Sequence, residues 1–186
     1  LSATGGTNIV QFENASTYLG NDFQLNKKLI FPYAQVNMNY NIGKSKRIWV
    51  NYEYIVNMPR ANQLLPVENI ANPLNTFIGN PNIGLIKNHN MYFNFNNFDY
   101  ATRTGYTLYF GGDYYDNQIA SSTTFDANGK RTTTYENVTG TIESWFGGHW
   151  NKSYKNEAHV FKFNVGVNMG YDKSKGFTNG EQYIAD

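Results

Sequence analysis

Cysteine is absent from this chain of 186 residues, which excludes disulfide bonds, thiolate metal sites and a cysteine nucleophile. No apolar run approaches the roughly 18 residues of a membrane-spanning helix, and residues 1–6 have neither the basic nor the apolar part of a signal peptide. Charge is scarce and balanced, because 15 Lys and Arg face 14 Asp and Glu for a net charge of +1. This balance gives no reason to expect a nucleic-acid partner.

Aromatic residues and asparagine are abundant instead. Aromatic side chains make up 17% of the chain, there are 28 asparagines, and the mean hydropathy is −0.56 although only 16% of residues are charged. Such an aromatic content argues against disorder. The polarity comes from uncharged Asn, Thr, Ser and Gly rather than from Lys and Glu, which is not typical of a soluble surface. We therefore expect residues 1–186 to form a single folded region with an unusual surface.

Apolar and polar residues alternate along most of the chain, which is the period of a β-strand rather than a helix. The clearest example is 160–171, where Phe161, Phe163 and Val165 alternate with Lys, Asn and Gly. Five more segments follow the same pattern: 36–42, 48–57, 91–98, 106–111 and 138–147. The pattern predicts an all-β protein of about eight antiparallel strands, each with one apolar and one polar face.

The predicted connections alternate between short and long. Short polar turns at 43–46, 100–104 and 151–157 alternate with long excursions at 58–88 and around 126–130. Strands from about 106–124 and 132–150 exceed the usual strand length, so we expect this hairpin to project beyond its sheet. An up-and-down order with short turns at one end and long loops at the other follows from this arrangement.

Two architectures accommodate such strands: a soluble antiparallel sandwich and a transmembrane β-barrel. The barrel is favoured because the polar faces carry Asn, Thr and Gly, as a lumen does, and because aromatic residues gather near strand ends. The aromatic residues that suit membrane-interface girdles are Phe31, Tyr33, Trp49, Tyr52, Tyr54, Phe98, Tyr106, Tyr114, Tyr115, Trp145, Trp150, Tyr154 and Tyr171.

An ordered set of motifs occupies residues 51–90. In sequence, these are NYEY at 51–54, MPRANQLLP at 58–66, NPL at 72–74, GNPNI at 79–83 and NHN at 88–90. This order and spacing resemble the TonB-dependent receptor barrels, especially the Bacteroidetes outer-membrane β-barrel family. The chain departs from the family at GLIK, 84–87, where Lys-Pro-Glu is usual, so the acidic and proline contribution to that loop is missing.

The resemblance implies a location in the bacterial outer membrane and a role in nutrient uptake. Family members hold a plug domain inside a barrel of about 22 strands, and a TonB-type energising protein moves the plug. We therefore expect 1–186 to be an internal part of a larger barrel, without the plug domain and the barrel C-terminus. The implied partners are outer-membrane lipid, the plug of the same parent chain, the energising protein and an unidentified small-molecule or oligosaccharide ligand.

Few residues point to chemistry. Asp113, Tyr114, Tyr115 and Asp116 could contact a sugar or peptide at the outer mouth by stacking and hydrogen bonding. Strand parity predicts that Glu53, Glu143 and Lys162 face the lumen, because a charge facing lipid would cost roughly 2 to 4 kcal/mol.

No motif supports a catalytic residue, a metal site or a cofactor, so we expect no enzymatic activity. The alternatives are a soluble extracellular carbohydrate-binding β-sandwich and a small self-contained outer-membrane barrel.

Overall fold

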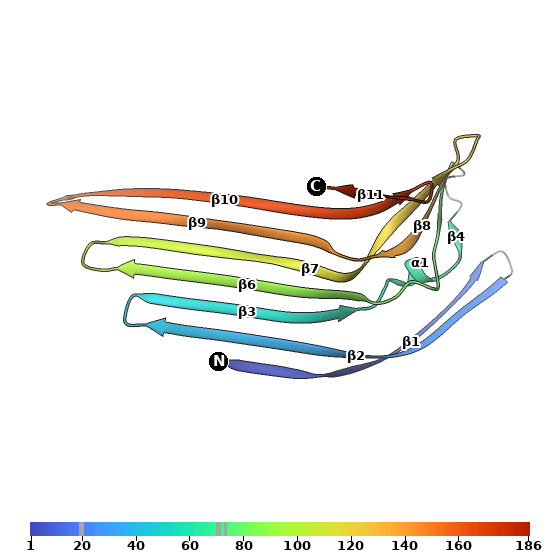
Figure 1. Ribbon diagram of the computed structural model, residues 1–186, viewed down its shortest axis with the longest axis horizontal. Coiled ribbons are helices and arrows are strands. Elements are labelled where there is room, and N and C mark those ends of the chain that lie inside the picture. Colours follow the sequence, from blue (N-terminus) through green and yellow to red (C-terminus); the bar gives the residue numbers. More distant parts are fainter. Residues whose placement is uncertain (19–20, 70–71, 73) are drawn as a thin grey trace.

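The alternating segments form long antiparallel strands in one curved sheet, with short elements gathered at one end (Figure 1). The computed structural model describes residues 1–18, 21–69, 72 and 74–186. In chain order the elements are β1 (Ser2–Tyr18), β2 (Asn21–Ile42), β3 (Lys46–Asn57), α1 (Ala61–Leu64), β4 (Glu68–Asn69), β5 (Asn75–Ile78), β6 (Ile86–Asp99), β7 (Thr104–Phe125), β8 (Arg131–Val138), β9 (Thr141–Asn156), β10 (His159–Thr178) and β11 (Glu181–Ala185).

The long strands are paired in chain order, from β1 through β2, β3, β6, β7 and β9 to β10. The prediction of an all-β, antiparallel up-and-down architecture is therefore confirmed. The predicted number of about eight strands compares with seven long strands and four short ones among the described residues. In the described part of the chain no pairing joins β1 to β10, so the sheet is open. We call the paired regions of β2, β3, β6, β7, β9 and β10 the strand band.

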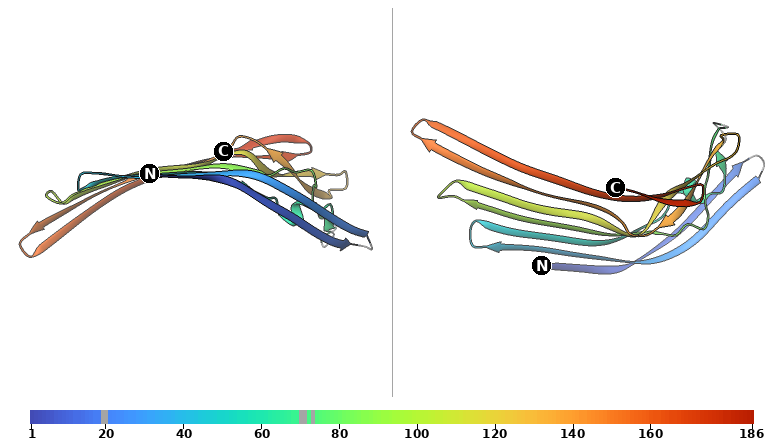
Figure 2. Two further views of the ribbon diagram at one scale, coloured as in Figure 1. Left: turned by 90° about the horizontal axis from the view of Figure 1, so that it is seen from below. Right: turned by 45° about the horizontal axis from the view of Figure 1, so that its top comes forward.

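The two ends of the strand band differ. Tight turns at 43–45, 100–103 and 157–158 join the strands at one end, which lies at the left of Figure 1. The opposite end carries α1, β4, β5 and β8, which together with the intervening residues of 58–85 we call the outer layer. In edge view the band is a thin, bent sheet (Figure 2). This arrangement has the sidedness that the loop lengths indicate.

The long hairpin changes partner halfway along. Residues 104–115 of β7 pair with β9, whereas 118–125 pair with β8, and the amide of Gly140 donates to Tyr115 O (2.9 Å) at the junction. Gly140 has a φ of +70°, a conformation that glycine adopts without steric cost. The hairpin therefore continues beyond the strand band, as its length predicts, but with a break at 139–140 that alternation does not indicate.

One face of the strand band is apolar and uncovered. Val165 is 62% exposed, Leu108 54% and Phe146 55%, although their side chains have no polar atoms. A sandwich would bury this face against a second sheet, and among the described residues no second sheet covers it. An apolar surface of this extent requires a nonaqueous environment or a partner. The helix among the described residues is too short and too polar to cross a membrane.

The predicted aromatic girdles divide between the two faces. Strand register places Tyr52, Tyr54, Tyr106, Tyr114, Trp150, Tyr154 and Tyr171 on the apolar face, near strand ends. Phe31, Tyr33, Trp49, Phe98, Tyr115 and Trp145 fall on the polar face, so their assignment to girdles is wrong. Nearness to a strand end does not identify a girdle residue, because the parity of each residue decides which face of the sheet it occupies.

Small buried clusters lie mainly in the outer layer and where it meets the band. Leu64 of α1 is 1% exposed, Ile83 5% and Val138 2%. The motif residue Asn80 connects three segments: its amide donates to Gln63 O (2.6 Å), its Nδ2 donates to Tyr135 O (2.8 Å), and its Oδ1 accepts from the Asn82 amide (2.9 Å). The long connection at 58–88 therefore has its own hydrogen-bond network and core. Pro73 of the NPL motif lies outside the described residues.

Candidate functional site

The polar face of the strand band carries a row of acidic side chains. Register aligns Glu53 with Asn90, Asn90 with Asp113, Asp113 with Glu143, and Glu143 with Asp172. Aligned residues on neighbouring strands share a face and lie side by side. Four carboxylates from β3, β7, β9 and β10 therefore form one line across the outer end of the polar face. We call these five residues the acidic row.

The acidic row has no neutralising base. Within the described residues, no Lys or Arg side chain lies within ion-pair distance of any of its carboxylates. Arg47 and Lys162 are on the same face but near the short turns, and Arg47 is six residues from Glu53 along β3. Six residues of strand span roughly 20 Å, about two and a half times the screening length at physiological salt. The acidic row therefore has no base beside it on the strands, and Arg47 and Lys162 lie toward the opposite end of the face.

Two asparagine side chains hold one carboxylate of the row. Nδ2 of Asn88 donates to Asp113 Oδ1 (2.7 Å), and Nδ2 of Asn90 donates to the same oxygen (3.0 Å). Asn88 is 8% exposed, and its Oδ1 has no hydrogen-bond partner. A buried acceptor without a donor costs about 1 to 3 kcal/mol. The amide that points at Asp113 therefore leaves an unsatisfied oxygen beside the acidic row.

A depression opens above Asn88, between the polar face and the outer layer. It has a volume of about 540 Å³, and its walls include Arg60 and Gln63 from the outer layer and Asn88, Tyr115 and Gln118 from the strands. Gln63 also accepts a hydrogen bond from the Arg60 amide through Oε1 (2.9 Å), which fixes the start of α1. The outer layer thus covers part of the polar face and shapes a site at its outer end.

Aromatic rings flank the acidic row on the polar face. Tyr92 and Trp145 lie in the neighbouring row toward the short turns, and Tyr115 lies in the neighbouring row toward the outer layer. Trp49 meets Tyr92 edge-on with ring centroids 5.1 Å apart. Trp145 lies across Gly111, where an added Cβ would come within 2.6 Å of its ring. Glycine at 111 therefore leaves room for this ring over the backbone of β7.

The four residues predicted to contact a ligand are not brought together. Asp113 and Tyr115 lie on the polar face, whereas Tyr114 lies on the apolar face. The pairing of β6 with β7 jumps from Tyr115 to Asn117, so Asp116 is the extra residue of a β-bulge. Asp113 and Tyr115 remain candidates for ligand contact, and the polar face also carries the predicted lumen residues Glu53, Glu143 and Lys162.

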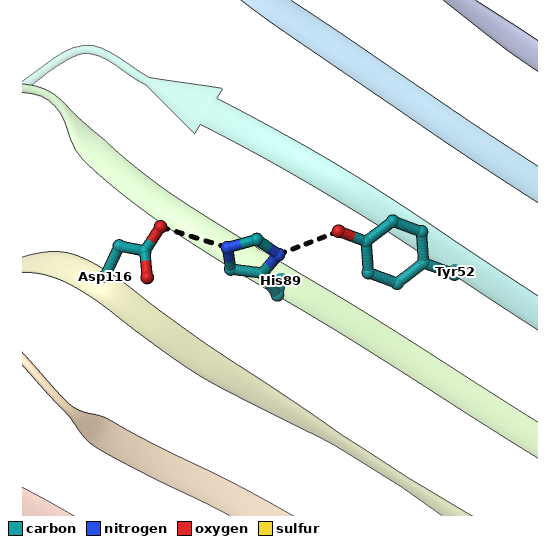
Figure 3. A network of polar contacts seen from close by, with 3 residues as sticks. All are labelled: Tyr52, His89 and Asp116. Carbon is teal, nitrogen blue, oxygen red and sulfur yellow. Dashed lines mark hydrogen bonds and ion pairs between the residues drawn. The ribbon is translucent and has the colours of Figure 1, made fainter.

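The bulge directs Asp116 to a histidine on the apolar side. His89 Nε2 lies 3.0 Å from Asp116 Oδ2, and Nδ1 lies 2.8 Å from the Tyr52 hydroxyl (Figure 3). The Tyr54 ring also packs on His89, with centroids 4.8 Å apart. This network ties β3, β6 and β7 together at the outer aromatic belt. The imidazole and carboxylate are exposed on the face opposite the acidic row, so they do not contribute to it.

The turn at the opposite end holds a carboxylate in a defined geometry. The Thr102 hydroxyl donates to Asp99 Oδ2 (2.8 Å), and the amides of Thr102 (3.3 Å) and Ala101 (2.9 Å) donate to Oδ1. The hydrogen bonds from Thr102, followed by that from Ala101, lower the pKa of Asp99 below its usual value, because they favour the ionised form. Asp99 thus stabilises the β6–β7 turn rather than forming a binding site.

Comparison with known proteins supports a membrane setting for these two faces. Residues 7–185 match the outer membrane protein beta-barrel family, which covers nearly the whole chain. No curated protein and no solved structure shows significant similarity to it.

Proposed function

Because the chain belongs to the outer membrane protein beta-barrel family, we propose that it forms part of the barrel wall of a TonB-dependent receptor-like transporter that takes up a nutrient. The protein resides in the bacterial outer membrane, as its family implies. Its uncovered apolar face, with Val165 62% exposed, suits contact with lipid. The opposite polar face would then line the lumen.

The main support for a receptor role is the depression between the outer layer and the polar face. A simple pore needs only a polar lumen, whereas a receptor needs a shaped outer site that binds its ligand. Arg60, Gln63, Asn88 and Tyr115 converge on such a site, and Asn80 holds the outer layer in place. Ligand capture would occur there, before an energised plug of the parent chain opens the lumen.

This wall would bind and guide the solute and carry out no catalytic step. The hydrogen-bonding residues of the polar face would contact the plug or the solute, and a TonB-type protein would act through the plug. The motifs at 51–90 support this assignment, because their resemblance to TonB-dependent receptors falls on β3, the outer layer and the start of β6.

Solute depletion from a defined medium tests the proposal. Cells with and without the protein are compared, each with an intact or inactivated energising system. We expect at least one solute to be consumed faster only when both the protein and the energising system are present. Uptake that needs the protein but no energy would indicate a passive pore, and no difference in any solute would contradict a transport role.

Two neighbouring tyrosines provide a matched pair of variants. Tyr115→Ala removes a ring from the depression, whereas Tyr114→Ala removes a ring from the apolar face. We expect Tyr115→Ala to slow uptake per inserted molecule and Tyr114→Ala to leave that rate unchanged. The amount inserted is measured in outer-membrane fractions. Equal effects of the two variants on the rate would contradict capture in this depression.

A further inference from the structure

We propose that the acidic row is a binding site for a solute with two or more ammonium or guanidinium groups, such as a basic oligopeptide. This inference deepens the proposed uptake function by naming a substrate class, and as a substrate assignment it rests on that function. Cation binding at the row itself does not depend on uptake.

The carboxylates of the acidic row repel one another. Like charges placed directly opposite on neighbouring strands are destabilising, and here Asp113, Glu143 and Asp172 occupy three consecutive strands in register. No basic side chain of the described residues compensates them. A sheet that keeps this repulsion gains from a cationic partner, which would neutralise several carboxylates at once.

The Oδ1 atom of Asn88 lies beside the acidic row without a hydrogen-bond donor. This side chain is more than nine-tenths buried and is aimed at Asp113 through its Nδ2, yet its Oδ1 has no donor. Asn51 on the same face also has a buried Oδ1 without a partner. Both oxygens are buried acceptors without donors, and an ammonium or guanidinium group bound beside Asp113 would supply donors once these side chains turn toward it.

The spacing of the carboxylates suits an organic cation rather than a metal ion. In the part of the chain that the structure describes, no three acidic or histidine side chains are close enough together to hold one metal ion. Neighbouring strands are about 4.8 Å apart, which spreads the carboxylates along a line rather than around a point. A line of charges suits a solute with several separated cationic groups.

Aromatic rings flank the acidic row and suit cationic side chains. Tyr92, Trp145 and Tyr115 border the acidic row on both sides. Ring faces attract ammonium and guanidinium groups, with the strongest attraction at tryptophan. They also pack against the methylene groups of lysine and arginine side chains. Carboxylates for the charged heads and rings for the apolar stems are the two contacts that a basic peptide requires.

Equilibrium binding to the intact protein in lipid nanodiscs provides the test. The probe is a fluorescent tri-lysine peptide, and a tri-glutamate peptide with the same dye is the reversed-charge control. We expect tri-lysine to bind at about 50 mM salt and to weaken strongly at about 500 mM, because screening shortens the range of the attraction. Tri-glutamate should not bind. Equal binding of both peptides, or no binding of tri-lysine because a basic segment inside the barrel occupies the row, would overturn the proposal.

Variants of matched charge locate the site. Asp113→Asn with Glu143→Gln removes two charges from the row, and Glu157→Gln with Glu181→Gln removes two charges elsewhere. We expect the first pair to weaken tri-lysine binding about tenfold, which corresponds to about 1.4 kcal/mol, and the second to change it less than about twofold. Equal weakening by both pairs would mean that tri-lysine binds through net charge and not at this row.

A variant that adds charge keeps the test decisive if the neutralised protein does not fold. Gln35 aligns with Glu53 on β2, so Gln35→Glu extends the row by one carboxylate. We expect Gln35→Glu to bind tri-lysine more tightly, and unchanged or weaker binding would contradict the proposal. Binding without energised uptake would retain this site while rejecting the proposed function. Uptake without tri-lysine binding would reject this site while retaining the proposed function.

Discussion

In the strand band, Val165 and Leu108 are more than half exposed, whereas Leu64 and Ile83 of the outer layer are almost completely buried. The strand band is held together by backbone pairing between long strands. Its apolar side chains are not buried within the protein and require contact with a nonpolar medium outside it. The outer layer instead buries its own small core and is fastened by Asn80. The comparison teaches that one chain can depend on two solvents, lipid for the band and water for the layer above it.

Truncation of the best-buried side chain should give the largest difference between the two regions. We expect Leu64→Ala to destabilise the outer layer by about 2 to 5 kcal/mol, because it leaves a cavity at a residue that is 1% exposed. Hydrogen exchange should show faster exchange in 58–85 while the strand band stays protected. Leu74→Ala, at a side chain 63% exposed, is the control and should have little effect. Loss of protection in both regions would show that they unfold as one unit.

A charge on either face of one strand should separate lipid from lumen. We expect Val165→Asp to destabilise the bilayer-inserted protein by about 2 kcal/mol, because the side chain lies on the apolar face between Phe163 and Val167. Asn164→Asp, one residue away on the polar face, should cost less than about 0.5 kcal/mol. Denaturant unfolding in vesicles, followed by tryptophan fluorescence, measures both. A tolerated Val165→Asp with a damaging Asn164→Asp would reverse the two faces.

The smallest expected effect concerns the short turns and their pH dependence. The lowered pKa of Asp99 means that folding favours its ionised form, so the stabilisation is present above the unfolded pKa of about 3.9 and is lost as pH falls through the folded value. Asp99→Asn should remove this acid sensitivity from the exchange rates of the β6–β7 turn. Thr102→Val should reduce it, since the Thr102 hydroxyl supplies the leading hydrogen bond. An unchanged pH profile in Asp99→Asn would assign the sensitivity to another group.

Alternation alone predicts the strand band well, because a period of two ties each residue to one face. Glu53, Glu143 and Lys162 fall on the polar face of the sheet as that parity requires. The family match supports the outer-membrane barrel to which the motifs at 51–90 pointed. Whether the polar face is the wall of a transporter lumen stays a prediction.

Features that depend on register cannot be predicted from alternation, because alternation assigns a face to each residue but not a partner on the next strand. The acidic row exists because β3, β6, β7, β9 and β10 pair with particular offsets, and the 28 residues of 58–85 between β3 and β6 give no sign of their offset in the sequence. The four residues at 113–116 divide between two faces because successive residues of a strand alternate, and the bulge at Asp116 shifts the register of β7 against β6 only beyond Tyr115. The missed residues Asn88 and Asn90 belong to the NHN motif at 88–90, which indicates a family resemblance but no ligand contact. Asp172 carries no motif, although it has the same parity along its strand as Lys162.

The up-and-down order of the strands has a kinetic consequence. Most long pairings join strands separated by a tight turn, so the corresponding hairpins can form early and locally. The pairing of β3 with β6 is different, because residues 58–85 must first be closed into a loop roughly ten times longer than the β2–β3 turn. Loop closure over that extra length costs about 2 kcal/mol more in chain entropy. The packing of Leu64 and the hydrogen bonds of Asn80 offset this cost. Folding of the outer layer therefore brings together the two parts of the sheet that it connects, one ending with β3 and the other beginning with β6.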